Sequence, residues 1–218
     1  MSGTNFICSL QSPFTMCISG MTKSGKSTLT GEILRRRNEI IQTPDGKTID
    51  RVVYCYTEDQ PKFFASLKAA IPCIEFNQGL PDDYSDGTDQ NSLVVLDDLM
   101  SEASKSKDAS MAFTRTSHHR NVSIIILVQS FFHKNIRTIT TNCAYLILTK
   151  NPRDSSFLAC LGRQMNGGRN HEQLNTAYKQ CMKIPYGYVF IDLTQEQNDL
   201  YRIRDSVFPE NCTVFSAK

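Results

Sequence analysis

The segment "GMTKSGKST", residues 20–28, has residue types and spacing that suit phosphate binding. It fits the pattern GxxxxGK[ST] without a mismatch. In this pattern, backbone amides of a glycine-rich loop and the start of the next helix surround phosphate oxygens. Lys26 is expected to reach the β- and γ-phosphates of ATP, and Ser27 to ligate Mg²⁺. A plain strand-to-helix turn is the alternative. The residues expected to bind the nucleotide are Gly20, Thr22, Lys23, Ser24, Gly25, Lys26, Ser27 and Thr28.

Two adjacent carboxylates follow a second apolar run, in "SLVVLDDLM". Mg²⁺ that bridges nucleotide phosphates needs a carboxylate at the end of a neighbouring strand. We assign Asp97 to the metal, directly or through water. Asp98 is then expected to activate a water for attack on the γ-phosphate. The alternative is a solvated acidic pair at a strand end.

A third apolar run, "SIIILVQS", ends in Gln129. We expect this strand to lie between the strands of residues 14–19 and 92–98, so that its carboxyl end faces the γ-phosphate. A neutral amide in that place can sense the phosphate or position the water. The alternative is a glutamine that only ends a strand.

The elements that must position these residues alternate between apolar runs and amphipathic stretches. Most apolar runs are continuous, which is typical of strands buried on both faces of a parallel sheet. The alternation predicts an α/β doubly wound fold. Predicted strands cover residues 14–19, 51–57, 92–98, 123–129, 144–150 and 186–193, and predicted helices cover 26–38, 61–70, 103–117, 155–165 and 170–183.

Composition excludes several classes of protein. The 218 residues are 40% hydrophobic and carry a formal net charge of +2, which is too balanced to indicate nucleic-acid binding by itself. The longest apolar runs are far below the roughly 20 residues that span a bilayer. No basic segment followed by an apolar core begins the sequence, so we expect no secretion and no membrane. The eight cysteines form no CxxC pair, and we expect reduced thiols and no zinc.

Taken together, "GMTKSGKST", "LVVLDD" and "FTRTSHHRNVSIIILVQSFF" resemble the FtsK–HerA superfamily of P-loop ATPases. More closely, the chain is similar to the genome-packaging ATPases of double-stranded DNA viruses, of the poxvirus type, and of related virus-like elements. The most distinctive segments are "SHHRNVSIIILVQ" and "TKNPRDSSFLACLGRQM", and the resemblance spans roughly residues 12–195. It implies a three-layer RecA-like sandwich with a mainly parallel central sheet. The implied domains are an arm at 1–11, the ATPase domain at 12–195 and an extension at 196–218.

The resemblance also implies a function. Members form homo-oligomeric rings that hydrolyse ATP with Mg²⁺ and pull double-stranded DNA into a capsid, docked to a capsid or portal component. The expected location is the host cytoplasm or nucleus, at assembling virions. By position, Lys26 and Ser27 bind phosphate and metal, the two aspartates form the second acidic motif, and Gln129 is the sensor. Asp98 departs from the glutamate that many related ATPases carry.

Ring ATPases of this kind also use an arginine from the neighbouring subunit, which is worth ~10³ to 10⁵ in rate. Arg120 is the first choice and Arg115 the second. The alternative for Arg120 is a surface charge. For DNA phosphates, the choices are Lys105, Lys107, Arg163 and Arg169, with a solvated surface charge as the alternative for each.

Two other functions are compatible with a phosphate loop. A P-loop kinase for a nucleotide or nucleoside needs an acceptor-binding acid and an arginine-rich lid, and "NPRDSS" is a meagre lid. A nucleotide-dependent scaffold that does not hydrolyse ATP is disfavoured by the intact Lys26, Ser27 and Asp97.

Overall fold

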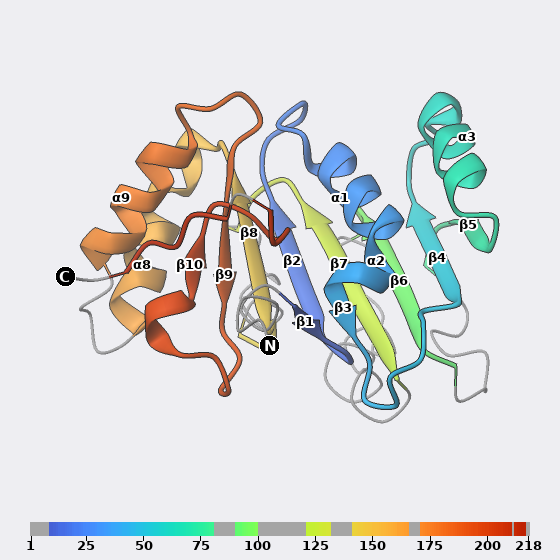
Figure 1. Cartoon of the computed structure of the whole chain (residues 1–218). Coiled ribbons are helices and arrows are strands. Elements are labelled where there is room, and N and C mark those ends of the chain that lie inside the picture. Colours follow the sequence, from blue (N-terminus) through green and yellow to red (C-terminus); the bar gives the residue numbers. More distant parts are fainter. Residues whose placement is uncertain are drawn as a thin grey trace. The chain divides into compact units, whose positions relative to one another are not determined.

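The computed structural model describes residues 9–80, 90–99, 121–131, 141–165, 171–210 and 212–216 (Figure 1). The chain divides into two compact units, and the division falls inside one strand and at the start of one helix. Unit 1 includes Ile18–Lys26 and the described residues of Gln129–Lys218. Unit 2 includes Leu10–Cys17 and the described residues of Ser27–Val128.

Unit 2 is built on strands that follow one another in the order β2-β7-β6-β4-β5, with β2 contributing its first residues. Strands β7, β6, β4 and β5 run parallel. Every residue of β6 and β7 is buried, as expected for strands covered on both faces. The predicted position of the third apolar run, between the other two, is confirmed. The bounds are β2 Thr15–Ser19, β7 Val122–Val128, β6 Ser92–Asp97, β4 Arg51–Tyr56 and β5 Ile74–Gln78.

Helices and an aromatic cluster complete unit 2. Helix α3, Pro61–Ala70, begins at a proline. Proline suits the first helical position because a backbone N–H there would have no acceptor within the helix. Its Phe64 ring packs at 4.6 Å, centroid to centroid, from Phe76 of β5. The predicted helix at 26–38 is interrupted at Arg36, whose ψ of 13° is not helical. The resulting elements are α1 Lys26–Arg35 and α2 Arg37–Ile40, and a small parallel pair joins β1 Leu10–Gln11 to β3 Ile41–Gln42.

Unit 1 is built on strands in the order β10-β9-β8-β2, with β2 contributing its last residues. Strand β9 runs antiparallel to both of its neighbours. Helix α9 packs against β9 and β10, and it also contacts α8. The bounds are β8 Tyr145–Thr149, α8 Ser155–Gln164, α9 His171–Cys181, β9 Tyr188–Asp192 and β10 Ile203–Arg204, with short 3₁₀ turns η2 Pro152–Asp154 and η4 Asp199–Tyr201.

A buried ion pair ties β10 to β9. Arg204 donates to an Asp192 carboxylate oxygen at 3.2 Å, and both side chains are almost fully buried. The Arg204 guanidinium also lies 4.5 Å from the ring centroid of Phe190. Beyond β10 the chain returns, and Phe215 donates its N–H to the Ile203 carbonyl. The residues that follow β9 therefore pack on unit 1.

The six predicted strands are confirmed, as is the α/β class with a mainly parallel sheet. Strands β1, β3, β5 and β10 were not predicted from the sequence. The predicted helix at 103–117 lies outside the described residues. Within the described part of the chain, no helix combines the length and apolar character required to cross a membrane.

Candidate functional site

The phosphate loop of unit 1 turns sharply between the end of β2 and the start of α1. Ser24 donates its N–H to the Met21 carbonyl at 3.1 Å. Lys23 and Gly25 have φ of 66° and 97°, in the left-handed region that favours glycine. Helix α1 begins at Lys26, directly after this turn. A glycine-rich turn that leads straight into a helix start provides inward amides and a positive dipole end, which fit a phosphate group.

The Lys26 side chain is folded back over its own loop. Its ammonium donates to the carbonyl oxygens of Gly20 at 2.6 Å and Met21 at 3.1 Å. The residue is only 9% exposed. These contacts fix a positive charge on the loop, where the motif requires a lysine for phosphate oxygens.

Thr149, the last residue of β8, holds the start of the loop. Its hydroxyl hydrogen-bonds to the Ser19 carbonyl at 3.0 Å and to Ser24 Oγ at 2.7 Å. A Cβ atom added to Gly20 would lie 1.6 Å from Thr149 Oγ1, so no other residue fits at Gly20 without a shift of the loop. Thr149 was not predicted from the sequence. Its only signal was a hydroxyl residue at the end of an apolar run.

Asp97 lies at the carboxyl end of β6 in unit 2. Its side chain is nearly buried and accepts a hydrogen bond from the Tyr54 hydroxyl at 2.8 Å. Tyr54 pairs in register with Val95, and residues two apart on a strand share a face. Asp97 is therefore a diagonal neighbour that a tyrosine is long enough to reach.

The Tyr54 hydroxyl has a pKa well above its ordinary value. Burial is the main cause, and the negative charge of Asp97 adds to it. Tyr54 therefore stays protonated and acts as a donor to the carboxylate. Tyr54 was not predicted from the sequence, because a tyrosine within "RVVYCYT" gives no indication of its partner 43 positions later.

Asp98 differs from Asp97 in burial and in backbone conformation. Its side chain is exposed and its φ is 56°, a value that aspartate tolerates better than most residues. Its N–H donates to the Leu127 carbonyl of β7 at 3.4 Å. Strand β6 ends at Asp97, and the Asp98 carboxylate lies at the surface of unit 2.

Gln129 follows β7 and is exposed in unit 1. Its carbonyl oxygen accepts from the Asn151 side-chain amide at 3.2 Å. Asn151 is itself 2% exposed, and its N–H donates to the Tyr178 hydroxyl of α9 at 2.8 Å. The backbone of Gln129 is thus fixed from the β8 side. Asn151 was not predicted from the sequence.

The remaining predicted residues are distributed as follows. Ser27 is half-buried on α1, and Thr22 and Thr28 are exposed. Arg163 is exposed on α8, where its Nε donates to the Ala159 carbonyl at 3.0 Å. The residues that lie outside the described part are Arg120, Arg115, Lys105, Lys107 and Arg169.

The donor chemistry suits a hard cation. Ser27 offers a hydroxyl oxygen and Asp97 a carboxylate oxygen, and Mg²⁺ prefers oxygen ligands from one or two protein groups together with phosphates and waters. No group of three or more histidines, cysteines or acidic residues that could hold a metal occurs among the described residues. The loop, Lys26 and Gln129 belong to unit 1, while Ser27, Asp97 and Asp98 belong to unit 2.

Comparisons with known proteins identify the family and the fold of the chain. The family model described as "Poxvirus A32 protein" matches residues 80–215, which is more than half of the chain. Among curated proteins, none matches. Three solved structures are similar at 11–12% identity and show the fold alone.

The first of these is the genome packaging NTPase B204 from Sulfolobus turreted icosahedral virus 2, with a TM-score of 0.50 over 84% of this chain and 93% of that one. The second is a KaiC-like protein from Pyrococcus horikoshii, with a TM-score of 0.50 over 94% and 90%. The third is the Type VII secretion ATPase EccC from Thermomonospora curvata, with a TM-score of 0.52 over 93% of this chain and 25% of that one.

We predict that Tyr54→Phe lowers the free energy of unfolding at pH 7 by about 1.5–3 kcal/mol, because it removes a hydrogen bond to a charged group. Above pH 10 the unfolded chain loses the Tyr54 proton while the folded protein keeps it. The contribution of Tyr54 is therefore lost as pH rises, by up to ~1.4 kcal/mol per pH unit. Denaturant titrations of both proteins from pH 7 to 11 should show the gap narrowing.

The matched control is Tyr56→Phe, on the same strand, because the Tyr56 hydroxyl is not the donor to Asp97. It should change stability little. Equal losses in the two variants, or a gap that does not depend on pH, would contradict the role assigned to Tyr54.

We predict that Thr149→Val weakens nucleotide binding and lowers the free energy of unfolding by about 1–3 kcal/mol, because the buried Ser19 carbonyl loses its side-chain donor. Thr149→Ser, which retains the hydroxyl, should bind nucleotide nearly as the unmodified chain does. Titration with a fluorescent ATP analogue measures the affinity. If valine and serine behaved alike, the hydroxyl would not be what holds the loop.

Proposed function

The chain belongs to the Poxvirus A32 protein family, and on that premise we propose that it is an ATPase that uses ATP hydrolysis to move double-stranded DNA into a viral capsid. The observation that carries the proposal is the phosphate loop, in which Gly25 is left-handed and the ammonium of Lys26 is held against the carbonyls of Gly20 and Met21. A loop of this kind binds the phosphates of a nucleoside triphosphate.

Each residue of the site has a role in this chemistry. The loop amides and Lys26 bind the phosphates, and Ser27 and Asp97 hold Mg²⁺. Held by these residues, Mg²⁺ would supply positive charge that offsets the charge of the nucleotide phosphates. Tyr54 keeps the Asp97 carboxylate in a fixed direction through its 2.8 Å hydrogen bond.

Asp98 and Gln129 act on the attacking water. Gln129 orients it, and the exposed Asp98 carboxylate accepts its proton. The water oxygen forms a bond to the γ-phosphorus as the bond from that phosphorus to the β–γ bridging oxygen breaks. ADP and inorganic phosphate are the products.

The proposal extends to an assembly. A homo-oligomeric ring lets Arg120 of one subunit act on the nucleotide of the next, with Arg115 as the second choice. Lys105, Lys107, Arg163 and Arg169 are the proposed contacts to DNA phosphates. The likeness to the genome packaging NTPase B204 supports a partner on the capsid and action at assembling virions.

We expect the unmodified chain to hydrolyse ATP, with faster turnover when duplex DNA is added, and Lys26→Ala to abolish turnover because the triphosphate loses its ammonium partner. Steady-state phosphate release measures both, alongside the assembly state by light scattering. Lys62→Ala, an exposed lysine on α3, is the control and should leave the rate unchanged. Phosphate transfer to a small acceptor without a DNA effect would instead indicate a kinase.

We expect Arg120→Ala subunits to assemble but to turn over ATP ~10³-fold or more slowly. When they are mixed with Lys26→Ala subunits, interfaces form that combine an intact loop with an intact arginine, and part of the activity should return. Phosphate release from mixtures of varied ratio measures this. Absence of rescue, with both variants still assembling, would count against an arginine that acts in trans.

A further inference from the structure

A pocket of about 370 Å³ lies beside the phosphate loop within unit 1. Its volume is within the range of small-molecule sites. The segment of residues 182–187, which connects α9 to β9, forms one wall, while the loop and the residue after β8 form the rest. The lining residues are Lys23, Ser24, Lys150, Met182, Lys183, Ile184, Pro185, Tyr186 and Gly187.

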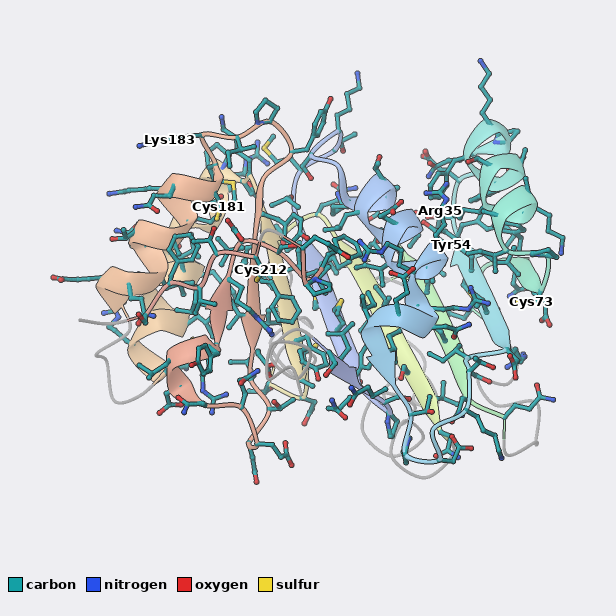
Figure 2. The ribbon with its side chains drawn as sticks, viewed as in Figure 1. Arg35, Tyr54, Cys73, Cys181, Lys183 and Cys212 are labelled. Atoms are coloured by element: carbon teal, nitrogen blue, oxygen red, sulfur yellow. The ribbon has the colours of Figure 1, made fainter. Side chains whose placement is uncertain are left out.

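Strand pairing brings this segment to the phosphate loop. Tyr188, the first residue of β9, pairs in register with Thr149, and Thr149 hydrogen-bonds to Ser24. In Figure 1 the loop that leads out of β2 and the loop that leads into β9 lie at the same end of the unit 1 strands. Figure 2 labels Lys183 at this end.

The segment is fixed by its own backbone. Ile184 donates to the Cys181 carbonyl at 3.1 Å, and Gly187 donates to the Ile184 carbonyl at 3.0 Å. A Cβ atom at Gly187 would lie 2.1 Å from the Cys181 carbonyl oxygen, so this position requires glycine. The pocket wall is therefore a hydrogen-bonded turn that follows directly on the end of helix α9.

Tyr186 stands at the edge between the pocket and the phosphate loop. It is 75% exposed and has a φ of 58°, which is unfavourable for a bulky aromatic residue. Its ring approaches the loop so closely that a Cβ atom on Gly25 would lie 3.1 Å from its Cδ1. Because most of the Tyr186 side chain is exposed, it contributes little buried apolar surface to the stability of the fold. Stability therefore does not explain an aromatic residue at this strained position.

The charge of the pocket favours an anionic ligand. Three lysines, Lys23, Lys150 and Lys183, line the pocket, and none of its lining residues carries a carboxylate. None of the three lysines has an acidic partner within the described ranges of the chain. Beside them, Ile184 and Tyr186 present apolar surface. Ile184 is 60% exposed. An aromatic ring joined to phosphates matches this combination.

We propose that this pocket binds the nucleoside of the nucleotide whose phosphates bind on the loop, with the base packed against the Tyr186 ring and Ile184. This rests on the proposed function. The lysines attract the polyanion, and Tyr186 is a binding residue for the base. Base–aromatic stacking tolerates any base, because every base has a π-face.

The test compares ATP with inorganic tripolyphosphate, which has the phosphates but no nucleoside. Both are titrated by calorimetry, with Mg²⁺, into the full chain. Tyr186→Ala should weaken ATP binding about tenfold or more, as loss of a stacked base does, and leave tripolyphosphate binding within about twofold. Tyr186→Phe should bind ATP as the unmodified chain does. Tyr201→Ala, an exposed tyrosine of η4, is the matched control and should change neither affinity.

The outcomes separate the two proposals. Lys26→Ala should weaken both probes, and if it does while Tyr186→Ala binds ATP normally, the nucleoside pocket is wrong and the proposed function stands. Equal weakening of both probes by Tyr186→Ala would mean that the ring only supports the loop at Gly25, which also overturns the pocket. If the unmodified chain bound neither probe, the proposed function itself would fail.

Discussion

The close approach of β8 to the first residue of the phosphate loop is the constraint on which the site of unit 1 depends. The Thr149 hydroxyl hydrogen-bonds to the Ser19 carbonyl and Ser24, and it leaves no space for a Cβ atom on Gly20. With the two ends of the turn held in this way, Gly25 can take its left-handed conformation and α1 can begin at Lys26. The glycines of the motif thus satisfy packing as well as phosphate access.

In unit 2 the corresponding constraint is the burial of a carboxylate. Removing a charge from water is costly unless hydrogen bonds replace the lost solvent. The fully buried strand β6 carries Asp97 into such surroundings, and the parallel register of β4 places the Tyr54 hydroxyl 2.8 Å away. Burial in turn keeps Tyr54 protonated. The same arrangement therefore stabilises the charge and fixes the direction of a group suited to a metal.

The sequence alone predicts those features that are local. Continuous apolar runs predicted the six main strands, and the GxxxxGK[ST] spacing predicted the turn before α1. Strand β5 was missed because "IEFNQ" is half polar, and the break at Arg36 interrupts an otherwise helical pattern. Tyr54, Thr149 and Asn151 were missed for another reason. Their roles depend on partners 43, 130 and 22 positions away in the sequence. Only the pairing of strands in the folded chain brings each residue to its partner.

The direction of β9 decides what surrounds the loop. An antiparallel strand begins at the end where its neighbour finishes, so the segment before Tyr188 emerges beside Thr149. Had β9 run parallel to β8, residues 182–187 would have entered at the opposite end, and Tyr186 would not reach Gly25. The departure from a fully parallel sheet in unit 1 therefore brings Tyr186 and Lys183 beside the phosphate loop. Phosphate binding alone does not require the antiparallel direction of β9. A site for the whole nucleotide does, because that direction brings residues 182–187 beside the loop.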